Sequence, residues 1–406
     1  MARPAATLMH LDEPVGDTIA AVPDMRSRWP VHAEDEIAAV ADVLRSGRVN
    51  SLHHGEQTLA FESAFASYCG VPYAIAVANG TLALELGLRA LDIGPGDEVI
   101  LPARSFFASA SCVVACGARP VFADVDPVSQ TLCPASVRAA LSSRTRAILC
   151  VHLAGWPCAM DELAALCRQH RLRLIEDCAQ AHGASFAGQK VGSFGDVAAF
   201  SFCTDKIMST GGEGGMLLIR GSRKVFDRAW SYKDHGKDRD RTTAKVAPGP
   251  RFRWLHDSFG SNFRMTEMQA AIGLRQLAKL PDWLAARRRN AARLSAALRG
   301  LAPIRLAEPP PHIEHAYYKY YAFADRDRDA LAAAIGELGV ACGSGTCPEI
   351  YRERAFADCP QARLPQARRL GRTSLMFQVD PTLDDAAMTA MGRAIGEACA
   401  TFGTAP

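Results

Sequence analysis

The feature of this sequence that most constrains its fold is an alternation of short apolar runs with stretches of helical periodicity, from about Trp29 to Ile219. The apolar runs have the length and composition of buried strands. They are Tyr73–Ala78, Glu98–Leu101, Pro120–Ala123, Ala147–His152, Leu172–Ile175, Val197–Phe202 and Met216–Ile219. Strands that alternate with helices predict an α/β fold, with a large, mixed, mostly parallel sheet flanked by helices.

Helical periodicity is clear in several segments. Glu34–Ser46 places Ile37, Val40, Ala41 and Leu44 on one helical face, and Gly47 is a natural stop. Further helices are predicted at Leu82–Leu91, Met160–Arg168, Thr266–Leu298 and Asp384–Cys399. The charged stretch Lys233–Arg253 contains Pro248-Gly249-Pro250 and lacks periodicity, so it is predicted to be a long loop.

The length of 406 residues favours two or three domains. We predict an N-terminal extension (1–28), a large domain (29–265), and connecting helices followed by a smaller C-terminal α+β domain (266–406). The smaller domain has a strand candidate at Tyr317–Phe323.

Bulk properties limit the classes of partner. The composition, 49% hydrophobic and 22% charged with a net charge of +3, gives no reason to expect nucleic acid or a membrane surface as a partner. Met1–Asp12 does not resemble a signal peptide, and no apolar run approaches the ~18 residues that span a bilayer, so a cytoplasmic location is expected. The thirteen scattered cysteines include no Cys-x-x-Cys pair, which favours reduced, mostly buried thiols and no metal.

Three short segments carry groups suited to chemistry. Arg171–Asp177 is a β-like run that ends in a carboxylate, where ligands lie in α/β sheets. Phe200–Lys206 leads from a β-like run into a lysine, followed by the glycine-rich Ser209–Gly215. The Asn79-Gly80-Thr81 turn lies between a strand and a helix, where free amides can bind an anion.

Each segment also has an ordinary structural explanation. Asp177 can cap a turn, Lys206 can be a surface lysine, and Asn79 or Thr81 can cap a helix. The order and number of the three signals, rather than any one of them, favour a common site.

Six segments together resemble the DegT/DnrJ/EryC1/StrS family of sugar aminotransferases, which have the aspartate-aminotransferase (type I) fold, and the resemblance runs from about Arg28 to Leu383. The segments are Ala78–Leu84, Asp97–Pro102, Gly117–Asp126, Glu176–Ala184, Phe200–Gly215 and Gly260–Ala271. The resemblance implies an enzyme that uses pyridoxal 5′-phosphate, which passes through pyridoxamine 5′-phosphate in its cycle.

The resemblance also implies a role for individual residues. Lys206 matches the Schiff-base lysine and general acid/base, and Asp177 matches the partner of the pyridine nitrogen. Phe106 matches an aromatic ring stacked on the cofactor, although an ordinary core position is the alternative. The remaining matches are Gln180 near the cofactor's phenolic oxygen and Gly80, Thr81 and Ser201 at its phosphate.

Asn262 matches an asparagine that reaches the cofactor phosphate of the neighbouring subunit, which implies a homodimer with shared active sites.

Two departures from the family pattern put the exact substrate in doubt. Asp205 precedes the lysine where a small or neutral residue is commoner, and Ser374–Gln378 replaces a more usual Leu-Pro pair. Family dehydratases carry histidine in place of the lysine, so Lys206 favours transamination.

The resemblance implies a ping-pong reaction from an amino acid, L-glutamate by analogy, to a nucleotide-diphosphate keto sugar at C4 or C3, in amino-sugar and surface-polysaccharide (O-antigen) biosynthesis. A cyclitol ketone is the alternative acceptor, and a non-catalytic, cofactor-bound regulator is a third hypothesis. His235 lies where relatives border the substrate. The basic residues around it, Lys233 among them, could meet a diphosphate or be solvated.

Overall fold

The computed structural model describes residues 24–52, 55–244, 252–359 and 363–403. The predicted strands of the first half of the chain all lie in one sheet. In order across the sheet they are β1 (Tyr73–Val77), β9 (Gly215–Ile219), β8 (Val197–Ser201), β5 (Arg173–Asp177), β4 (Thr145–Val151), β2 (Glu98–Pro102) and β3 (Arg119–Ala123). The five strands from β8 to β3 are parallel, whereas β9 is antiparallel to both of its neighbours, β1 and β8.

Both faces of the sheet are buried, because alternate residues along each strand pack into hydrophobic cores on opposite sides of it. In β8, Val197 and Ala199 join a core formed with α3 (Gly80–Ala90) and α4 (Ala108–Ala115). Ala198 and Phe200 point to the opposite face, where they join a core that includes Phe61 and Phe65 of α2 (Glu56–Cys69). Because both faces are buried, the strand sequences are continuously apolar and do not alternate between apolar and polar residues. Farther along the sheet, α5 (Pro134–Ala140) and α6 (Met160–His170) cover it.

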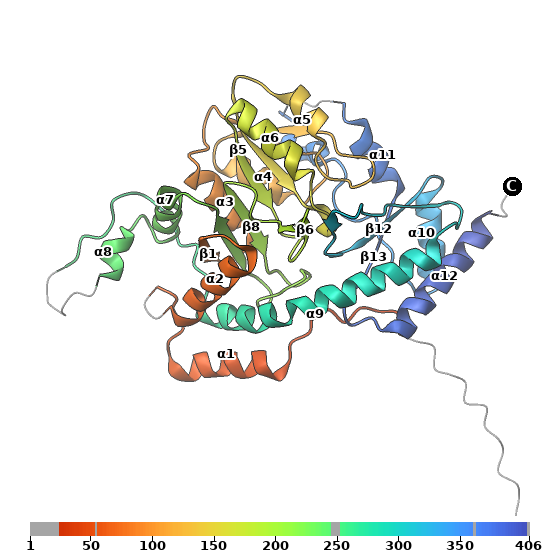
Figure 1. Cartoon of the computed structure of the whole chain (residues 1–406), viewed down its shortest axis with the longest axis horizontal. Coiled ribbons are helices and arrows are strands. Elements are labelled where there is room, and N and C mark those ends of the chain that lie inside the picture. The colour runs from red at the N-terminus through yellow and green to blue at the C-terminus, as the bar shows by residue number, and fades with distance from the viewer. Residues whose placement is uncertain (1–23, 53–54, 245–251, 360–362, 404–406) are drawn as a thin grey trace, which may run out of the picture.

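The long helix α9 (Glu267–Leu298) links the main sheet to the C-terminal part of the chain (Figure 1). Thr266 caps it in a capping box with Gln269. Ala270 and Leu280 belong to the core of the main sheet, whereas Leu294 and Leu298 belong to a C-terminal core. Since α9 contributes to both cores, the division of the chain at residue 265 stays a prediction.

The C-terminal core is built on a three-stranded antiparallel sheet, with β12 at its centre. Its strands are β10 (Ile304–Leu306), β12 (Tyr320–Ala324) and β13 (Ser374–Phe377). Helices α10 (Arg328–Glu337) and α12 (Asp385–Gly403) pack on it, and α11 (Pro365–Thr373) precedes β13. A further small sheet joins β6 (Ser185–Phe186) to β7 (Gln189–Lys190) and β11 (Ile313–Glu314).

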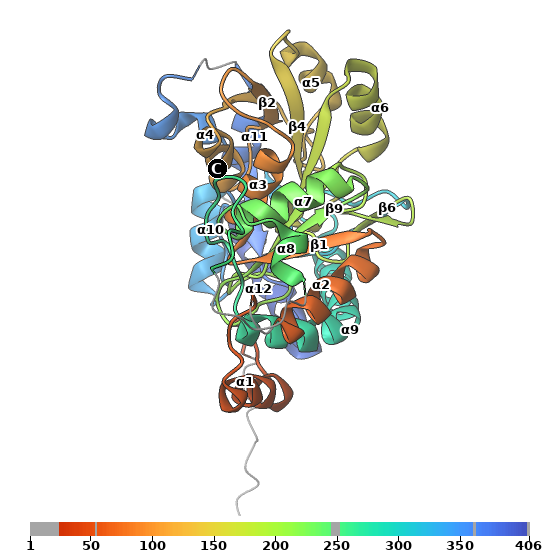
Figure 2. The same cartoon turned by 90° about the vertical axis from the view of Figure 1, so that its left-hand side faces the viewer.

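Helix α1 (Glu34–Ser46) is confirmed with the predicted bounds, but it turns its apolar face outward. Ile37 and Leu44 are 54% and 56% exposed, whereas Glu36 and Val43 are buried. Glu36 is held at α9, where its carboxylate accepts a hydrogen bond from Lys279 at 2.8 Å. Figures 1 and 2 both show α1 lying below α9, at the margin of the molecule.

An arm projects from the β1 edge of the main sheet (Figure 1). It begins with α7 (Arg223–Lys233) and contains a short helix, α8 (Arg239–Thr243). The prediction of a loop throughout Lys233–Arg253 is therefore wrong at α8, where Asp238 supplies a helix cap by accepting the N–H of Arg241. Residues 245–251 of the predicted loop lie outside the described residues.

The cysteines are all free thiols and most are buried, as predicted. Among the described residues, the side chains found at metal-ligand spacing include neither Cys112 nor Cys116, and Cys116 donates to the carbonyl of Glu85. Within the described ranges, no helix combines the length and the hydropathy that a membrane span requires.

Candidate active site

Four loops meet at the carboxyl-terminal edge of the main sheet. Because β1, β2, β5 and β8 run in the same direction, the segments that follow them emerge at one edge. These segments contain the residues predicted from the sequence: the turn at Asn79, the loop at Phe106, Asp177, and the segment from Ser201 to Lys206.

The turn after β1 and the end of β8 approach each other closely. A Cβ added to Gly80 would lie 2.6 Å from the Cβ of Ser201, so only glycine allows this approach. Asn79 caps α3 by accepting the N–H of Leu82 at 2.9 Å, and the exposed Thr81 follows Gly80 in the first turn. The helix end therefore presents amides and two hydroxyls, from Thr81 and Ser201, to an anion.

The carboxylate of Asp177 is buried at the end of β5, with 5% of the residue exposed. Its Oδ2 accepts a hydrogen bond from Ser109 Oγ at 2.7 Å, and its Oδ1 accepts the N–H of Ala179 at 3.1 Å. Burial raises the pKa of Asp177, while the hydrogen bond from Ser109 and the charge of Lys206 act in the opposite direction. A buried carboxylate held in this way is suited to bind a cationic nitrogen.

Lys206 lies on the tight connection between β8 and β9. Thr204 donates its N–H to the carbonyl of Gly212 at 3.0 Å, and Gly212 has a φ of 122°, which a side chain would strain. The carbonyl of Lys206 accepts the indole N–H of Trp29 at 2.7 Å. The backbone of the lysine is thus held from two sides, while 17% of its side chain is exposed.

The amine of Lys206 has two polar neighbours. Its Nζ lies 3.3 Å from the hydroxyl of Tyr318 and 3.5 Å from Oδ1 of Asp205. The hydroxyl of Tyr318 donates to the other oxygen of Asp205. Burial raises the pKa of Asp205, but the charge of Lys206 and the hydrogen bond from Tyr318 outweigh it and leave that pKa below its ordinary value.

Tyr318 is the site residue that the sequence did not single out. It was one of four tyrosines near the predicted strand at 317–323, and nothing in the sequence ranks them. The structure distinguishes it because its hydroxyl lies 3.3 Å from Nζ of Lys206. The buried Arg287 of α9 holds the backbone there by donating to the carbonyls of Tyr317 and Tyr318 at 3.3 and 3.4 Å. The one available signal was Asp205, the unusual neighbour of the lysine, which here accepts the tyrosine hydroxyl.

Gln180 and Phe106 lie on loops that border the same edge. The side-chain oxygen of Gln180 accepts the N–H of Ala154 at 2.7 Å, which leaves its amide NH₂ to donate. Phe106 is 64% exposed, so the alternative of an ordinary core phenylalanine is wrong. An exposed ring beside Ser105 and Ser109, whose hydroxyls are 2.7 Å apart, is available to stack on a planar ligand.

Asn262 and His235 lie at the base of the arm, on two crossing segments. Asp234 pairs with Asn262 in a β-bridge, and His235 donates its N–H to the carbonyl of Ser261 at 3.0 Å. Both Asn262 and His235 are exposed, and the carbonyl of Phe263 accepts the N–H of Ala78 beside the phosphate turn. The base of the arm is therefore tied to the end of β1.

Lys233 is not available to a ligand, which corrects the suggestion that it could meet a diphosphate. The residue is buried at the end of α7, and its Nζ forms an ion pair with Asp234 at 2.6 Å. The buried Asp234 also pairs with Arg264, so the lysine charge serves to compensate a carboxylate inside the protein.

A buried group of His152, Glu176 and Cys178 lies behind Asp177, with ligand atoms at metal-like separations. Both nitrogens of His152 are already used, since Nδ1 accepts the N–H of Cys158 and Nε2 lies 3.1 Å from Glu176. Glu176 also accepts three backbone N–H groups, from Gly192, Phe194 and Gly195. We therefore interpret the group as a structural hydrogen-bond network.

The donor set fits pyridoxal 5′-phosphate. A helix end with two hydroxyls suits its phosphate, a buried carboxylate suits its pyridine nitrogen, and an amine suits its aldehyde carbon. Thr81, Asp177 and Lys206 supply these three groups at one edge of the sheet.

Comparison with known proteins identifies the family. Residues 30–395 match the profile of the DegT/DnrJ/EryC1/StrS aminotransferase family. The chain is 34% identical to a dTDP-3-amino-3,4,6-trideoxy-α-D-glucose transaminase of Streptomyces venezuelae, over 89% of this chain and 91% of the relative. It is 40% identical to an L-glutamine:2-deoxy-scyllo-inosose aminotransferase of Streptomyces fradiae, over 84% and 80%.

The solved structures agree with the sequence relatives. An aminotransferase from Psychrobacter cryohalolentis superposes with a TM-score of 0.89 at 45% identity, over 93% of this chain and 100% of that one. The chain therefore belongs to the DegT/DnrJ/EryC1/StrS family and is a pyridoxal-phosphate-dependent aminotransferase of type I fold.

Proposed function

We propose that this enzyme transfers the amino group of an amino acid, L-glutamate, to C4 or C3 of a nucleotide-diphosphate keto sugar. It would act in the cytoplasm, in amino-sugar biosynthesis for surface polysaccharides such as O-antigen. The convergence of Lys206, Asp177 and the Gly80–Ser201 contact at one sheet edge carries the proposal. The similarity to a transaminase of a dTDP-linked sugar supports the choice of acceptor.

Each residue at the sheet edge has a role in this proposal. Gly80, Thr81 and Ser201 would hold the cofactor phosphate, and Asp177 would pair with the pyridine nitrogen. Gln180 would donate its amide to the phenolic oxygen, and Phe106 would stack on the ring. When bound, the cofactor supplies an electron sink for the bond pair released at the donor's α-carbon.

Proton transfer would be the work of Lys206. Its Nζ would take a proton from the donor's α-carbon and pass it to the cofactor, and in the second half of the reaction it would take a proton back from the cofactor and deliver it to the acceptor carbon. Tyr318 and Asp205 hold Nζ between a hydroxyl and a carboxylate, which fixes the direction from which the amine approaches. Asp177 stays ionised beside the ring nitrogen and stabilises positive charge there.

We further propose a homodimer in which Asn262 reaches the phosphate of the partner's cofactor. The outward apolar face of α1 supports this, because Ile37 and Leu44 are too exposed for a helix that lacks a partner. The projecting arm carries three more exposed aromatic side chains. They are Phe252, Trp254 and Phe259, at 73%, 79% and 98% exposed.

His235 would then approach the sugar from the base of the arm. Its left-handed backbone, with a φ of 63°, directs the segment sharply before Gly236, where a Cβ would collide with Ser258. This turn fixes the point on the arm from which the imidazole of His235 projects.

A cyclitol ketone is the second candidate acceptor. The observation that favours it is the 40% identity to an inosose aminotransferase, which exceeds the identity to the dTDP-sugar transaminase. Neither Lys206 nor Asp177 distinguishes the two acceptors, since Lys206 would act at the carbon that receives the amine and Asp177 at the cofactor's ring nitrogen, and neither role depends on the rest of the substrate.

The test uses the cofactor-loaded protein in two steps. Addition of L-glutamate should convert the aldehyde absorbance of the cofactor to that of its amine form, and dTDP-, UDP- or GDP-linked keto sugars should then reverse the change. Reversal by scyllo-inosose derivatives alone would select the cyclitol alternative. A cofactor spectrum that responds to no amino donor would instead favour the regulator.

A further inference from the structure

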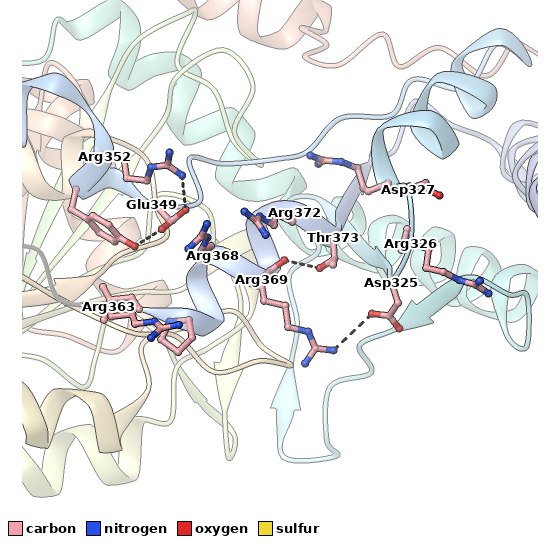
Figure 3. Close-up of a pocket in the computed structure, with 15 residues that line it drawn as sticks. Asp325, Arg326, Asp327, Glu349, Arg352, Arg363, Arg368, Arg369, Arg372 and Thr373 are labelled. Carbon is pink, nitrogen blue, oxygen red and sulfur yellow. Dashed lines mark hydrogen bonds and ion pairs between the residues drawn. The ribbon is translucent and has the colours of Figure 1, made fainter.

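A cavity whose lining is distinct from the candidate active site lies between three segments of the C-terminal half. Its volume is about 850 Å³, and its walls come from residues 324–328, residues 349–352 and residues 363–373, which include α11. Figure 3 shows these segments and the side chains that surround the space. No residue assigned above to the cofactor or the substrate lines it.

The cavity gathers positive charge. Seven arginines line it, against three acidic residues, so its excess of positive charge is larger than the net charge of +3 of the whole chain. The arginines are Arg326, Arg328, Arg352, Arg363, Arg368, Arg369 and Arg372. A concave surface with one sign of charge concentrates ions of the other sign.

Part of this charge is compensated within the cavity. Arg352 lies 3.2 Å from Glu349, and Arg369 lies 3.8 Å from Asp325. Among the described residues, Arg363, Arg368 and Arg372 have no acidic partner within ion-pair distance. Figure 3 shows Arg352, Arg368 and Arg372 gathered beside Glu349, with Arg363 below them.

The clustered arginines destabilise helix α11. Arg368 and Arg372 are four residues apart on α11, where like charges repel and destabilise a helix, and the first turn contains no acidic residue. The helix is held instead by Asp124 at the end of β3, whose carboxylate accepts the N–H groups of Gln366 and Ala367 at 3.0 and 2.8 Å. Helix α11, held at its first turn by Asp124, thus presents two like-charged guanidinium groups to the cavity.

We propose that this cavity binds a small-molecule anion with at least two linked phosphate groups. Guanidinium groups bind phosphate in pairs of parallel hydrogen bonds, and several arginines around one space suit several phosphate oxygens. The volume lies in the range of pockets for ligands of nucleotide size. Tyr351, Leu364 and Pro365 add a less polar wall against which the rest of such a ligand can pack.

The test measures binding to the holoenzyme, so that the cofactor already fills the phosphate site beside Gly80. Titration calorimetry with inorganic pyrophosphate at low ionic strength should give saturable binding, with one site per chain in addition to the cofactor. Orthophosphate should bind at least about tenfold more weakly, because it engages fewer guanidinium groups. UDP shows whether a nucleoside adds affinity to the diphosphate.

Charge-reversed variants locate the site. Arg368→Glu and Arg372→Glu should each weaken pyrophosphate binding by about tenfold or more, because a charge-assisted pair is replaced by repulsion. The matched control, Arg138→Glu, makes the same change in net charge on the exposed face of α5 and should leave binding within about twofold of the unaltered protein. Binding that ignores the changes on α11, or equal binding of orthophosphate, overturns the proposal.

Arg368→Gln separates binding from folding. Removal of one member of the repelling pair should leave the melting temperature of the ligand-free protein equal or higher, while pyrophosphate binding is weakened. A protein that binds no pyrophosphate before any substitution contradicts the proposal directly. So does an Arg368→Gln variant that binds pyrophosphate as tightly as the unaltered protein.

Discussion

At the scale of single residues, Tyr318 and Asp205 define the surroundings of the amine of Lys206. The tyrosine is 112 positions away from Lys206 in the sequence, yet its hydroxyl is 3.3 Å from Nζ. The pair explains why an acidic residue is tolerated beside the lysine, because Asp205 accepts a hydrogen bond from the hydroxyl of Tyr318 and need not pair with Lys206 alone.

We predict that Tyr318→Phe lowers kcat by about tenfold with little change in the KM of the amino donor, since a hydrogen bond to a charged partner is lost at the step that moves the proton. Steady-state kinetics with L-glutamate would measure this. Tyr320→Phe is the matched control, because it removes a hydroxyl that bonds Ser295 at 2.9 Å instead. Equal kinetics of the two variants would refute the role of Tyr318.

A second residue-scale prediction concerns acid stability. His182 is fully buried beside Phe200 and Phe202, and burial together with the charge of Lys206 lowers its pKa from 6.5 to about 3. The unfolded chain therefore binds a proton between these values while the folded chain does not. The stability that the neutral His182 contributes to the folded protein is fully present above the pKa of histidine in the unfolded chain, and it is lost as the pH falls below that value toward the folded pKa.

The free energy of unfolding of the unaltered protein should thus fall relative to His182→Gln by about 1.4 kcal/mol per pH unit between pH 6 and 4. Urea denaturation of both proteins at fixed protein concentration would measure the difference. His315, whose pKa burial also lowers to about 3, remains in both proteins and cancels. Parallel pH profiles would contradict a neutral, buried His182.

At the scale of elements, the strands of the main sheet could be predicted from the sequence to within one or two residues, whereas the strand predicted at Tyr317–Phe323 begins three residues later, at Tyr320. Their apolar runs are short and bounded, so burial on both faces leaves a clear pattern, as in β8. The antiparallel direction of β9 could not be predicted, because apolar content does not encode direction. The exposure of the apolar face of α1 could not be predicted either, because helical periodicity identifies an apolar face but not the part of the molecule that packs against it.

The residues proposed to hold the cofactor could be selected from their order along the chain, whereas contacts between distant segments could not. Asp177 and Ser201 end strands that the apolar pattern reveals, and Lys206 lies on the connection that follows β8, so the sheet brings all three to one edge. Tyr318 reaches Lys206 only through the packing of α9, where Arg287 holds the tyrosine backbone. The arginine cavity likewise joins three segments that no local pattern relates.

The junction of α3 with β8 gives the element-scale prediction. Gly80→Ala should weaken cofactor binding by about tenfold or more, because the added methyl would meet Ser201 and push the helix end out of place. Gly221→Ala is the control, since its Cβ would meet nothing within 4 Å. Absorbance titration of dialysed protein with pyridoxal 5′-phosphate checks this, and equal affinities of both variants would argue against a phosphate site here.

At the scale of the whole molecule, the arm and α1 predict a dimer with shared sites. Lys206→Ala and Asn262→Ala should each be nearly inactive alone. A mixed dimer of the two should recover about half of the activity of the unaltered dimer, because one of its two sites then has both residues intact. Activity of heterodimers purified with two affinity tags would measure this, and inactive heterodimers would place Asn262 outside the partner's site.

The central claim is that Lys206 carries the cofactor. Borohydride reduction of the purified holoenzyme fixes the imine between the cofactor and its lysine, and peptide mass spectrometry then locates it. The account predicts the added mass on Lys206, in the peptide that contains Phe200–Lys206, and no such peptide from Lys206→Ala. The cofactor mass on any other lysine would contradict it.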